Sequence, residues 1–146
     1  MIDVRVQSDA FDPGAELERL EALRVGAVAS FTGLVRADGG LIAMTLEHYP
    51  AMTQTALYDI AADAARRWPL AGLVVIHRHG RLVPGERIVF VAAASRHRAA
   101  ALEACAYLID WLKTDAPFWK REEWQDGSSK WVDAKAEDDA AKTRWQ

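Results

Sequence analysis

Residues 72–98, GLVVIHRHGRLVPGERIVFVAAASRHR, contain two apolar runs, at 72–79 and 86–94, separated by the segment GRLVPG. Both runs are rich in β-branched residues, and the proline and glycines between them favour a loop, so we predict two connected strands. Ser95 is an expected N-cap for a helix that runs to about Thr114. This strand–loop–strand–helix unit indicates a fold that mixes sheet and helix.

The sequence before this unit repeats the same kinds of signal. Residues 2–7 alternate in polarity like a strand. Asp12 followed by Pro13 is typical of an N-cap and a first helical position, so we expect a helix through about Leu23. A further helix is predicted to begin at Thr53 and to end near Trp68, because a residue before proline avoids helical angles.

Two further segments indicate strand pairs. Residues 26–35 look like a buried strand, the Asp-Gly-Gly at 38–40 is a turn signal, and 41–49 alternates, so we predict a hairpin over 26–49. Near the C-terminus, FWKREEW (118–124) and KWVDA (130–134) are expected to pair across the turn DGSS. The whole pattern predicts an α+β fold with a mainly antiparallel sheet and packed helices. The helix before the last pair is expected to bury one face, which carries Leu102, Cys105, Ile109 and Leu112.

Length and composition describe an ordinary globular protein. The 146 residues, 51% hydrophobic and 27% charged, fit a single domain over 1–146, with 136–146 as a C-terminal tail. We see neither a signal peptide nor a membrane helix, and the single cysteine, Cys105, fits a reducing cytoplasm. No Cys-x-x-Cys, His-x3-His or glycine-rich phosphate loop occurs, so neither a metal nor a nucleotide cofactor is indicated.

Basic residues gather at two places in the second half of the chain. His97 and Arg98 lie at the expected start of a helix, where cations oppose the helix dipole, so this end favours an anion as ligand. Lys113 and Lys120 flank the apolar Pro117, Phe118 and Trp119. Lys113 at a helix end and a Lys-Arg-Glu run on an edge strand are both compatible with simple solvated surface. Alternatively, clustered cations beside apolar walls bind protons less tightly, which suits a catalytic lysine.

The spacing of the two basic clusters constrains how they can act together. Arg98 and Lys113 lie 15 residues apart on one predicted helix, which is about 22 Å at 1.5 Å per residue. One small ligand cannot span both clusters within one chain. Either there are two unrelated sites, or a second copy of the chain brings its His97 and Arg98 to the lysines of the first.

Several segments together resemble the large, catalytic subunit of molybdopterin synthase. The resemblance covers nearly the whole chain, and LKTDAPFWKRE is its most specific segment. The matching segments are FTGLVR (31–36), LEHYPAMT (46–53), RWPL (67–70), IHRHGRLVPGE (76–86), SRHR (95–98), LKTDAPFWKRE (112–122), WVDAK (131–135) and RW (144–145).

The resemblance implies an α/β hammerhead fold and a sulfurtransferase activity. The family converts cyclic pyranopterin monophosphate (precursor Z) into molybdopterin by adding two sulfurs, a step of molybdenum cofactor biosynthesis. The sulfur arrives as a thiocarboxylate on the C-terminal glycine of a small ubiquitin-like subunit. The implied assembly is a heterotetramer built around a homodimer of the large subunit.

The resemblance also assigns roles to residues of this sequence. The family's essential lysine falls on Lys113 and its second lysine on Lys120. The implied substrate-binding residues are Phe31, Leu34, Val35, Arg36, His97, Arg98, Lys113, Lys120, Arg121, Glu122 and Lys135.

Two positions depart from the family pattern, and one alternative function remains open. Ala51 stands where the family usually has glycine, and Lys135 stands where it more often has arginine. Lysine keeps the positive charge but cannot make the two parallel hydrogen bonds of a guanidinium group.

The alternative is a non-catalytic binding or scaffold module that docks the ubiquitin-like partner or a polyanion. The net charge of −3 is unfavourable for general polyanion binding.

Overall fold

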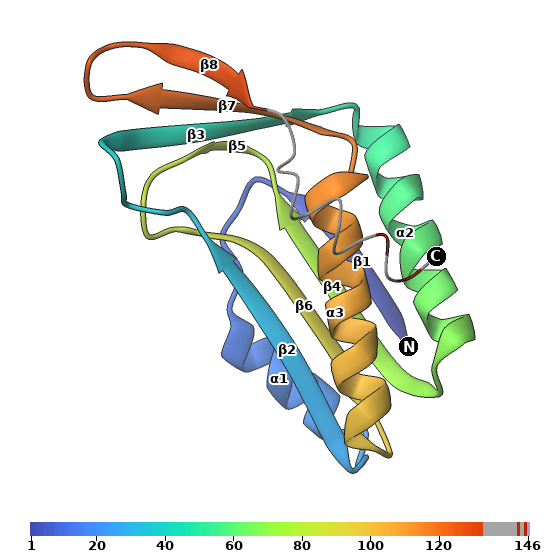
Figure 1. Ribbon diagram of the computed structural model, residues 1–146. Helices are drawn as coiled ribbons and strands as arrows, with labels where there is room; N and C mark the ends of the chain where they lie inside the picture. The colour runs from blue at the N-terminus through green and yellow to red at the C-terminus, as the bar shows by residue number, and fades with distance from the viewer. Residues whose placement is uncertain (133–142, 144, 146) are drawn as a thin grey trace.

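The computed structural model describes residues 1–132, 143 and 145 and consists of two four-stranded sheets with three helices (Figure 1). The first sheet has the strand order β1-β4-β6-β2, and the second has the order β5-β3-β7-β8. All pairs are antiparallel except β1 with β4. The α+β prediction is therefore confirmed. The elements are β1 (Ile2–Gln7), α1 (Pro13–Glu21), β2 (Ala27–Leu34), β3 (Leu41–His48), α2 (Pro50–Arg67), β4 (Leu70–Arg78), β5 (Gly80–Leu82), β6 (Arg87–Ser95), α3 (Arg98–Thr114), β7 (Phe118–Trp124) and β8 (Ser129–Val132).

The core explains why β4 and β6 are continuous apolar runs. Alternate side chains such as Val75 and Val91 pack towards α2 and α3. Their neighbours, such as Ile76 and Phe90, pack in a second cluster with Leu20 of α1. Because helices cover both faces of the first sheet, its central strands need apolar residues at every position rather than at every second one. Within the described residues, no helix is long and apolar enough to cross a membrane.

The predicted hairpin over residues 26–49 is wrong, because its two strands lie in different sheets. β2 pairs with β6, whereas β3 pairs with β5 and β7. After β2, the Val35 amide donates to the Glu86 carbonyl at 2.9 Å and the Gly85 amide donates to the Val35 carbonyl at 2.9 Å. These bonds continue the pairing of β2 along the loop before β6, and the chain then crosses to the second sheet.

The expectation that residues 26–35 form a buried strand is correct for the strand and wrong for the burial. β2 lies at the edge of the first sheet, and its side chains are mostly half-buried or exposed. Phe31 is 37% exposed and Leu34 is 54% exposed. An edge strand is covered on fewer sides than a central one, so apolar composition alone overstated its burial.

Helix starts were predicted correctly where the cap is local. Asp12 caps α1, and its Oδ1 accepts from the amides of Gly14 and Ala15 at 3.0 and 3.4 Å. Helix α2 begins earlier than expected, at Pro50, and Thr53 lies buried inside it with its hydroxyl donating to the Tyr49 carbonyl. Proline at the first helical position explains the earlier start, since it needs no amide partner there.

Ser95 does not cap α3, contrary to prediction. It is the buried last residue of β6, and its hydroxyl donates to the Pro69 carbonyl at 2.8 Å. The N-cap is His97, whose side chain makes no capping hydrogen bond. The predicted buried face of this helix is also wrong at Leu102, which is 59% exposed. Cys105 and Leu112 are buried as predicted, and the buried face also carries Ala101, Ala104 and Leu108.

The second sheet contains the predicted C-terminal hairpin and one strand that the sequence did not reveal. β7 and β8 pair antiparallel, which confirms the hairpin. The loop GRLVPG contributes the three-residue β5, which pairs with β3. Figure 1 shows this sheet lying across one end of the first sheet, close to the C-terminal end of α3.

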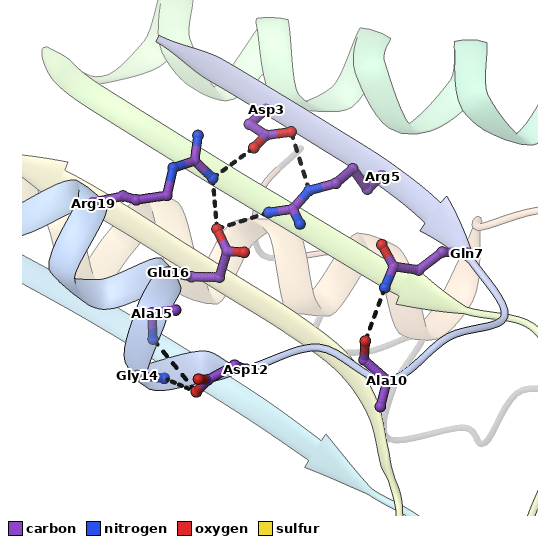
Figure 2. Close-up of polar contacts among 9 residues, drawn as sticks. All are labelled: Asp3, Arg5, Gln7, Ala10, Asp12, Gly14, Ala15, Glu16 and Arg19. Carbon is purple, nitrogen blue, oxygen red and sulfur yellow. Dashed lines mark hydrogen bonds and ion pairs between the residues drawn. The ribbon is translucent and has the colours of Figure 1, made fainter.

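A cluster of charged side chains fastens α1 to β1 (Figure 2). Arg19 reaches both Asp3 and Glu16, at 2.9 and 2.6 Å, and Arg5 reaches Glu16 at 2.7 Å. Glu16 is only 7% exposed, so its carboxylate needs these partners in place of water. The cluster fixes α1 on the face of the first sheet opposite to α2 and α3.

Candidate active site

A cavity of about 510 Å³ lies where the C-terminal end of α3 meets the second sheet and the end of β2. Cavities of this size are typical of small-molecule sites. Six of the side chains that line it bear on its chemistry: Phe31, Leu34, Arg36, His77, Lys113 and Lys120.

The two lysines reach this cavity because a short connection joins α3 to β7. Lys113 lies in the last turn of α3, which ends at Thr114. Lys120 lies on β7, where it pairs with Leu46 of β3 and with Val132 of β8. Side chains alternate along a strand, so Phe118 and Lys120 face the cavity while Trp119 between them does not line it. Trp119 is 47% exposed on the other face of the sheet.

The residues that follow Lys120 lie elsewhere. Arg121 points to the face opposite Lys120, and its guanidinium lies 5.9 Å from the centre of the Trp131 ring. Glu122 pairs in register with Met44 and Lys130. Neither Arg121 nor Glu122 is among the described residues that line the cavity.

The FTGLVR segment supplies one wall of the cavity. Phe31, Leu34 and Arg36 line it, whereas Val35 is 2% exposed and belongs to the hydrophobic core. The strand bulges between Gly33 and Leu34, and a Cβ at Gly33 would lie 2.6 Å from Val89 Cγ1. Gly33 therefore lets β2 approach β6 closely at the point where β2 contributes its side chains to the cavity wall.

His97 and Arg98 lie at the opposite end of α3 from this cavity. Figure 1 shows α3 as one continuous helix, with its start near the beginning of β2 and its end beneath the second sheet. The helix rise places Arg98 and Lys113 about 22 Å apart. The side chains of His97 and Arg98 are both exposed. The backbone just before them is tightly packed, because a Cβ at Gly26 would lie 2.3 Å from the Arg96 carbonyl oxygen. One chain does not bring the two basic clusters together.

Lys135 lies outside the described residues. Cys105 is described, and it is a buried residue whose thiol contacts the Val91 carbonyl at 3.8 Å. Burial raises the pKa of Cys105 to about 11, so the thiol is protonated at neutral pH and is a poor nucleophile. The interpretation of Cys105 as core packing is confirmed. No group of three or more His, Cys, Asp or Glu among the described residues is arranged to hold a metal ion.

His77 is a lining residue that the sequence did not single out. It is 7% exposed, lies on β4, and stacks on Phe118 with ring centres 4.0 Å apart and an angle of 17°. Burial lowers the pKa of His77 to about 4. The hydrogen bond to the Arg78 carbonyl acts against this shift, and the charge of Lys113 adds to it. The available signal was a histidine inside an otherwise apolar strand, next to a segment rich in basic residues.

Within the described part of the chain, the charged side chains that line the cavity are all basic. Arg36, Lys113 and Lys120 line it, and no aspartate or glutamate is among the described lining residues. With apolar walls from Phe31, Phe118 and their neighbours, such a cavity attracts anionic groups and strengthens their interaction with the cations. The arrangement can hold an anionic substrate and stabilise negative charge that develops during a reaction.

Known proteins share both the sequence and the fold. The family model described as MoaE protein matches residues 6–115. A molybdopterin synthase catalytic subunit of Pseudomonas aeruginosa is 53% identical over 148 residues, which cover 98% of this chain and 98% of the relative. The solved structure of the molybdopterin biosynthesis MoaE protein from Burkholderia ambifaria has a TM-score of 0.85 at 49% identity and covers 99% of this chain and 98% of that one.

A more distant structure shares the fold. It is a protein–protein complex of subunits 1 and 2 of the molybdopterin-converting factor from Helicobacter pylori, with a TM-score of 0.70 at 23% identity, covering 92% of this chain and 90% of that one. The family match and the close relatives determine the assignment. The chain belongs to the MoaE family of molybdopterin synthase catalytic subunits, which are sulfur-transferring enzymes of molybdopterin biosynthesis.

Proposed function

We propose that this chain is the catalytic subunit of a molybdopterin synthase and converts cyclic pyranopterin monophosphate into molybdopterin. Two sulfur atoms come from the thiocarboxylated C-terminal glycine of a small ubiquitin-like partner. The observation that carries the proposal is the approach of Lys113 and Lys120, from α3 and β7, to one cavity that has apolar walls and a further cation in Arg36.

The two lysines stabilise the negative charge of the reaction. The thiocarboxylate is anionic when it enters, and charge moves from its sulfur towards the pterin side chain as the new carbon–sulfur bond forms and a carbon–oxygen bond of that side chain breaks. Water then cleaves the bond between this sulfur and the glycine carbonyl carbon, which leaves the sulfur on the pterin and a carboxylate on the partner. Ammonium groups fixed beside apolar walls stabilise such charge without reorganising. One of the two lysines also donates or accepts the proton that each transfer requires.

The substrate's phosphate is bound jointly by two copies of the chain. Arg36 lines the cavity of its own copy. His97 and Arg98 lie about 22 Å along α3 from Lys113, so they reach this cavity only from a second copy. A symmetric dimer makes this exchange twice and yields two equivalent sites.

The sulfur-carrying partner enters with its extended tail. A solved complex of subunits 1 and 2 of the molybdopterin-converting factor of Helicobacter pylori has the same fold in one of its chains. In the present chain, the exposed Phe31 and Leu34 lie at the rim of the cavity and offer apolar contact to such a tail. Two partners on one dimer give a heterotetramer. We place this reaction in the cytoplasm, which agrees with a single, reduced cysteine.

Alanine variants at the two lysines test the proposal. The assay measures molybdopterin formed from cyclic pyranopterin monophosphate and thiocarboxylated partner. Loss of one charge-stabilising donor costs about a hundredfold to a thousandfold in rate, so Lys113→Ala and Lys120→Ala should each show a loss of this order. Lys130→Ala is the matched control, because Lys130 lies on β8 and does not line the cavity. Near-normal product formation by folded Lys113→Ala protein would remove this residue from the chemistry.

A further inference from the structure

Strand β2 is an edge strand that lacks the usual protection of such edges. Within the described residues it pairs with β6 and with no other strand. Its sequence, AVASFTGL (27–34), contains no charged residue and no proline, and its bulge lies at one end, between Gly33 and Leu34. Proteins usually protect a sheet edge with charges, prolines or short length, because free backbone groups otherwise pair with another chain. We therefore expect another chain to cover β2.

Helix α3 leaves an apolar stripe uncovered on the same flank of the molecule. Figure 1 shows α2 on one side of α3 and β2 on the other. Glu103 marks the side towards α2, because it accepts from Trp68 Nε1 at 2.8 Å. Away from α2, Leu102 is 59% exposed. It belongs to a stripe, at spacings of three and four residues, that is exposed or half-buried and consists of Ala99, Leu102, Ala106 and Ile109.

The edge of β2 and the stripe of α3 both extend from one basic cluster to the other. Ala27 pairs with Ser95, just before His97 and Arg98, and Leu34 lines the cavity together with Lys113. The seven steps of β2 span about 23 Å, and α3 spans about 22 Å between its two basic ends. We call this combined surface, the free edge of β2 with the stripe of α3, the seam.

A second copy of the chain matches the seam by symmetry. A two-fold axis through the middle of the seam reverses the direction of both elements, so β2 meets β2 and α3 meets α3 in antiparallel orientation. Arg98 of one copy then lies opposite Lys113 of the other. Leu102 lies opposite Ile109, because both pairs have the same midpoint along the helix. The exposed leucine thus gains an apolar partner.

The spacing of the elements allows both contacts at once. Neighbouring strands lie about 4.8 Å apart, and α3 packs on both β2 and β6, so its axis lies about midway above them. When two β2 edges pair, the two α3 axes are therefore about 10 Å apart. Packed helices normally lie about 8–10 Å apart.

The ends of the seam bring like charges together. His97 and Arg98 of one copy approach the three cations that line the cavity of the other, which are Arg36, Lys113 and Lys120. An anion between the two groups relieves this repulsion. Association of the copies and anion binding then favour each other, because such coupling is reciprocal.

We propose that the seam is the contact between two copies of this chain, with β2 paired to β2 and α3 packed on α3, and that an anion at each end strengthens it. The inference rests on the proposed function for the exchange of His97 and Arg98 between copies, and it names the surface that makes the exchange. Its tests need no turnover, so their outcome is independent of the proposed activity.

A cysteine beside the two-fold axis gives the first test. Ala106 lies next to the midpoint of α3, where helix axes about 10 Å apart leave two Cα atoms about 5–6 Å apart, a distance that a disulfide spans. Under mild oxidation, Ala106→Cys protein should become a covalent dimer. Ala56→Cys is the matched control, because Ala56 is also half-buried but lies on α2. Wild type controls for the buried Cys105. Cross-linking no faster than in Ala56→Cys would overturn the seam.

A charge placed on the stripe gives the second test. Leu102→Asp leaves the single chain intact, because Leu102 is exposed there, but it buries a carboxylate against the second copy. Sedimentation velocity should show monomers for this variant. Met52→Asp, at a position on α2 that is 49% exposed, should sediment like the wild-type dimer. Leu102→Asp protein that remains as dimeric as Met52→Asp would contradict the proposed contact.

Inorganic phosphate tests the role of the anion. Tagged and untagged wild-type chains are mixed, and affinity capture over time gives the rate at which mixed dimers form. Exchange should be about fivefold or more slower in phosphate than in chloride of equal ionic strength. Arg98→Ala chains should exchange equally fast in both salts, which separates the proposed site from binding elsewhere. Equal rates for wild type in the two salts would overturn the coupling.

Discussion

Mild acid should destabilise this protein through His77 in particular. The unfolded chain has an ordinary histidine pKa of 6.5, whereas burial lowers the pKa of His77 to about 4 in the folded state. Between these values the unfolded state binds the proton and the folded state does not. Stability from this group is therefore complete above pH 6.5 and is lost as the pH falls towards 4. The full difference is about 3 kcal/mol, of which about 2 kcal/mol is already lost at pH 5.

Urea unfolding of wild type and His77→Phe at pH 7.5 and pH 5 measures this contribution. The variant keeps the stack on Phe118 and lacks the titrating ring, while the carboxylates and His48 are common to both proteins. Wild type should therefore lose about 2 kcal/mol more than the variant between the two pH values. Equal losses in the two proteins would refute the argument that His77 is buried and neutral.

Two further predictions concern the support of the site. Gly26→Ala should lower the free energy of unfolding by about 1–3 kcal/mol in urea denaturation, because its Cβ would lie 2.3 Å from the Arg96 carbonyl oxygen; unchanged stability would show that the backbone before His97 is not packed there. Tyr107→Phe should flatten the loss of stability at alkaline pH. Burial and the hydrogen bond to Asp63 raise the pKa of Tyr107 to about 12, so this group stabilises the fold fully below pH 10 and less as the pH rises towards 12. Parallel loss in wild type and variant between pH 9 and 11 would contradict this.

Local signals in the sequence were sufficient for most helices and strands. Asp12 with Pro13 defined the start of α1 because both act within the first turn. The continuous apolar runs defined β4 and β6 because helices on both faces demand such a pattern. Pairing between strands was not predictable in the same way. The choice of β6 rather than β3 as partner of β2 depends on contacts between residues about 60 positions apart, which no local pattern encodes.

The site was predictable where spacing along one helix sufficed. The rise of α3 separates Arg98 from Lys113, as their spacing of 15 residues predicts. The place of His77 in the cavity wall was not predictable, because in a strand buried on both faces the polarity pattern does not show which side meets a cavity. Of the residues assigned by resemblance, Val35 lies in the core, and Arg121 and Glu122 lie away from the described cavity wall. Their roles in substrate binding stay predictions, as does that of Lys135.

Complementation between two inactive variants tests the central claim most directly, namely that a cationic cavity is completed by a second copy of the chain. Lys113→Ala and Arg98→Ala chains are mixed in equal amounts, dissociated, reassociated and assayed for molybdopterin formation. Half of the dimers are then mixed, and each has one site with both residues intact, so activity should return to about a quarter of wild type. Arg98→Ala chains mixed with chains that carry both Lys113→Ala and Arg98→Ala should stay inactive, because no chain in this mixture supplies Arg98. Activity no higher than the mean of the two separate variants would contradict a shared site.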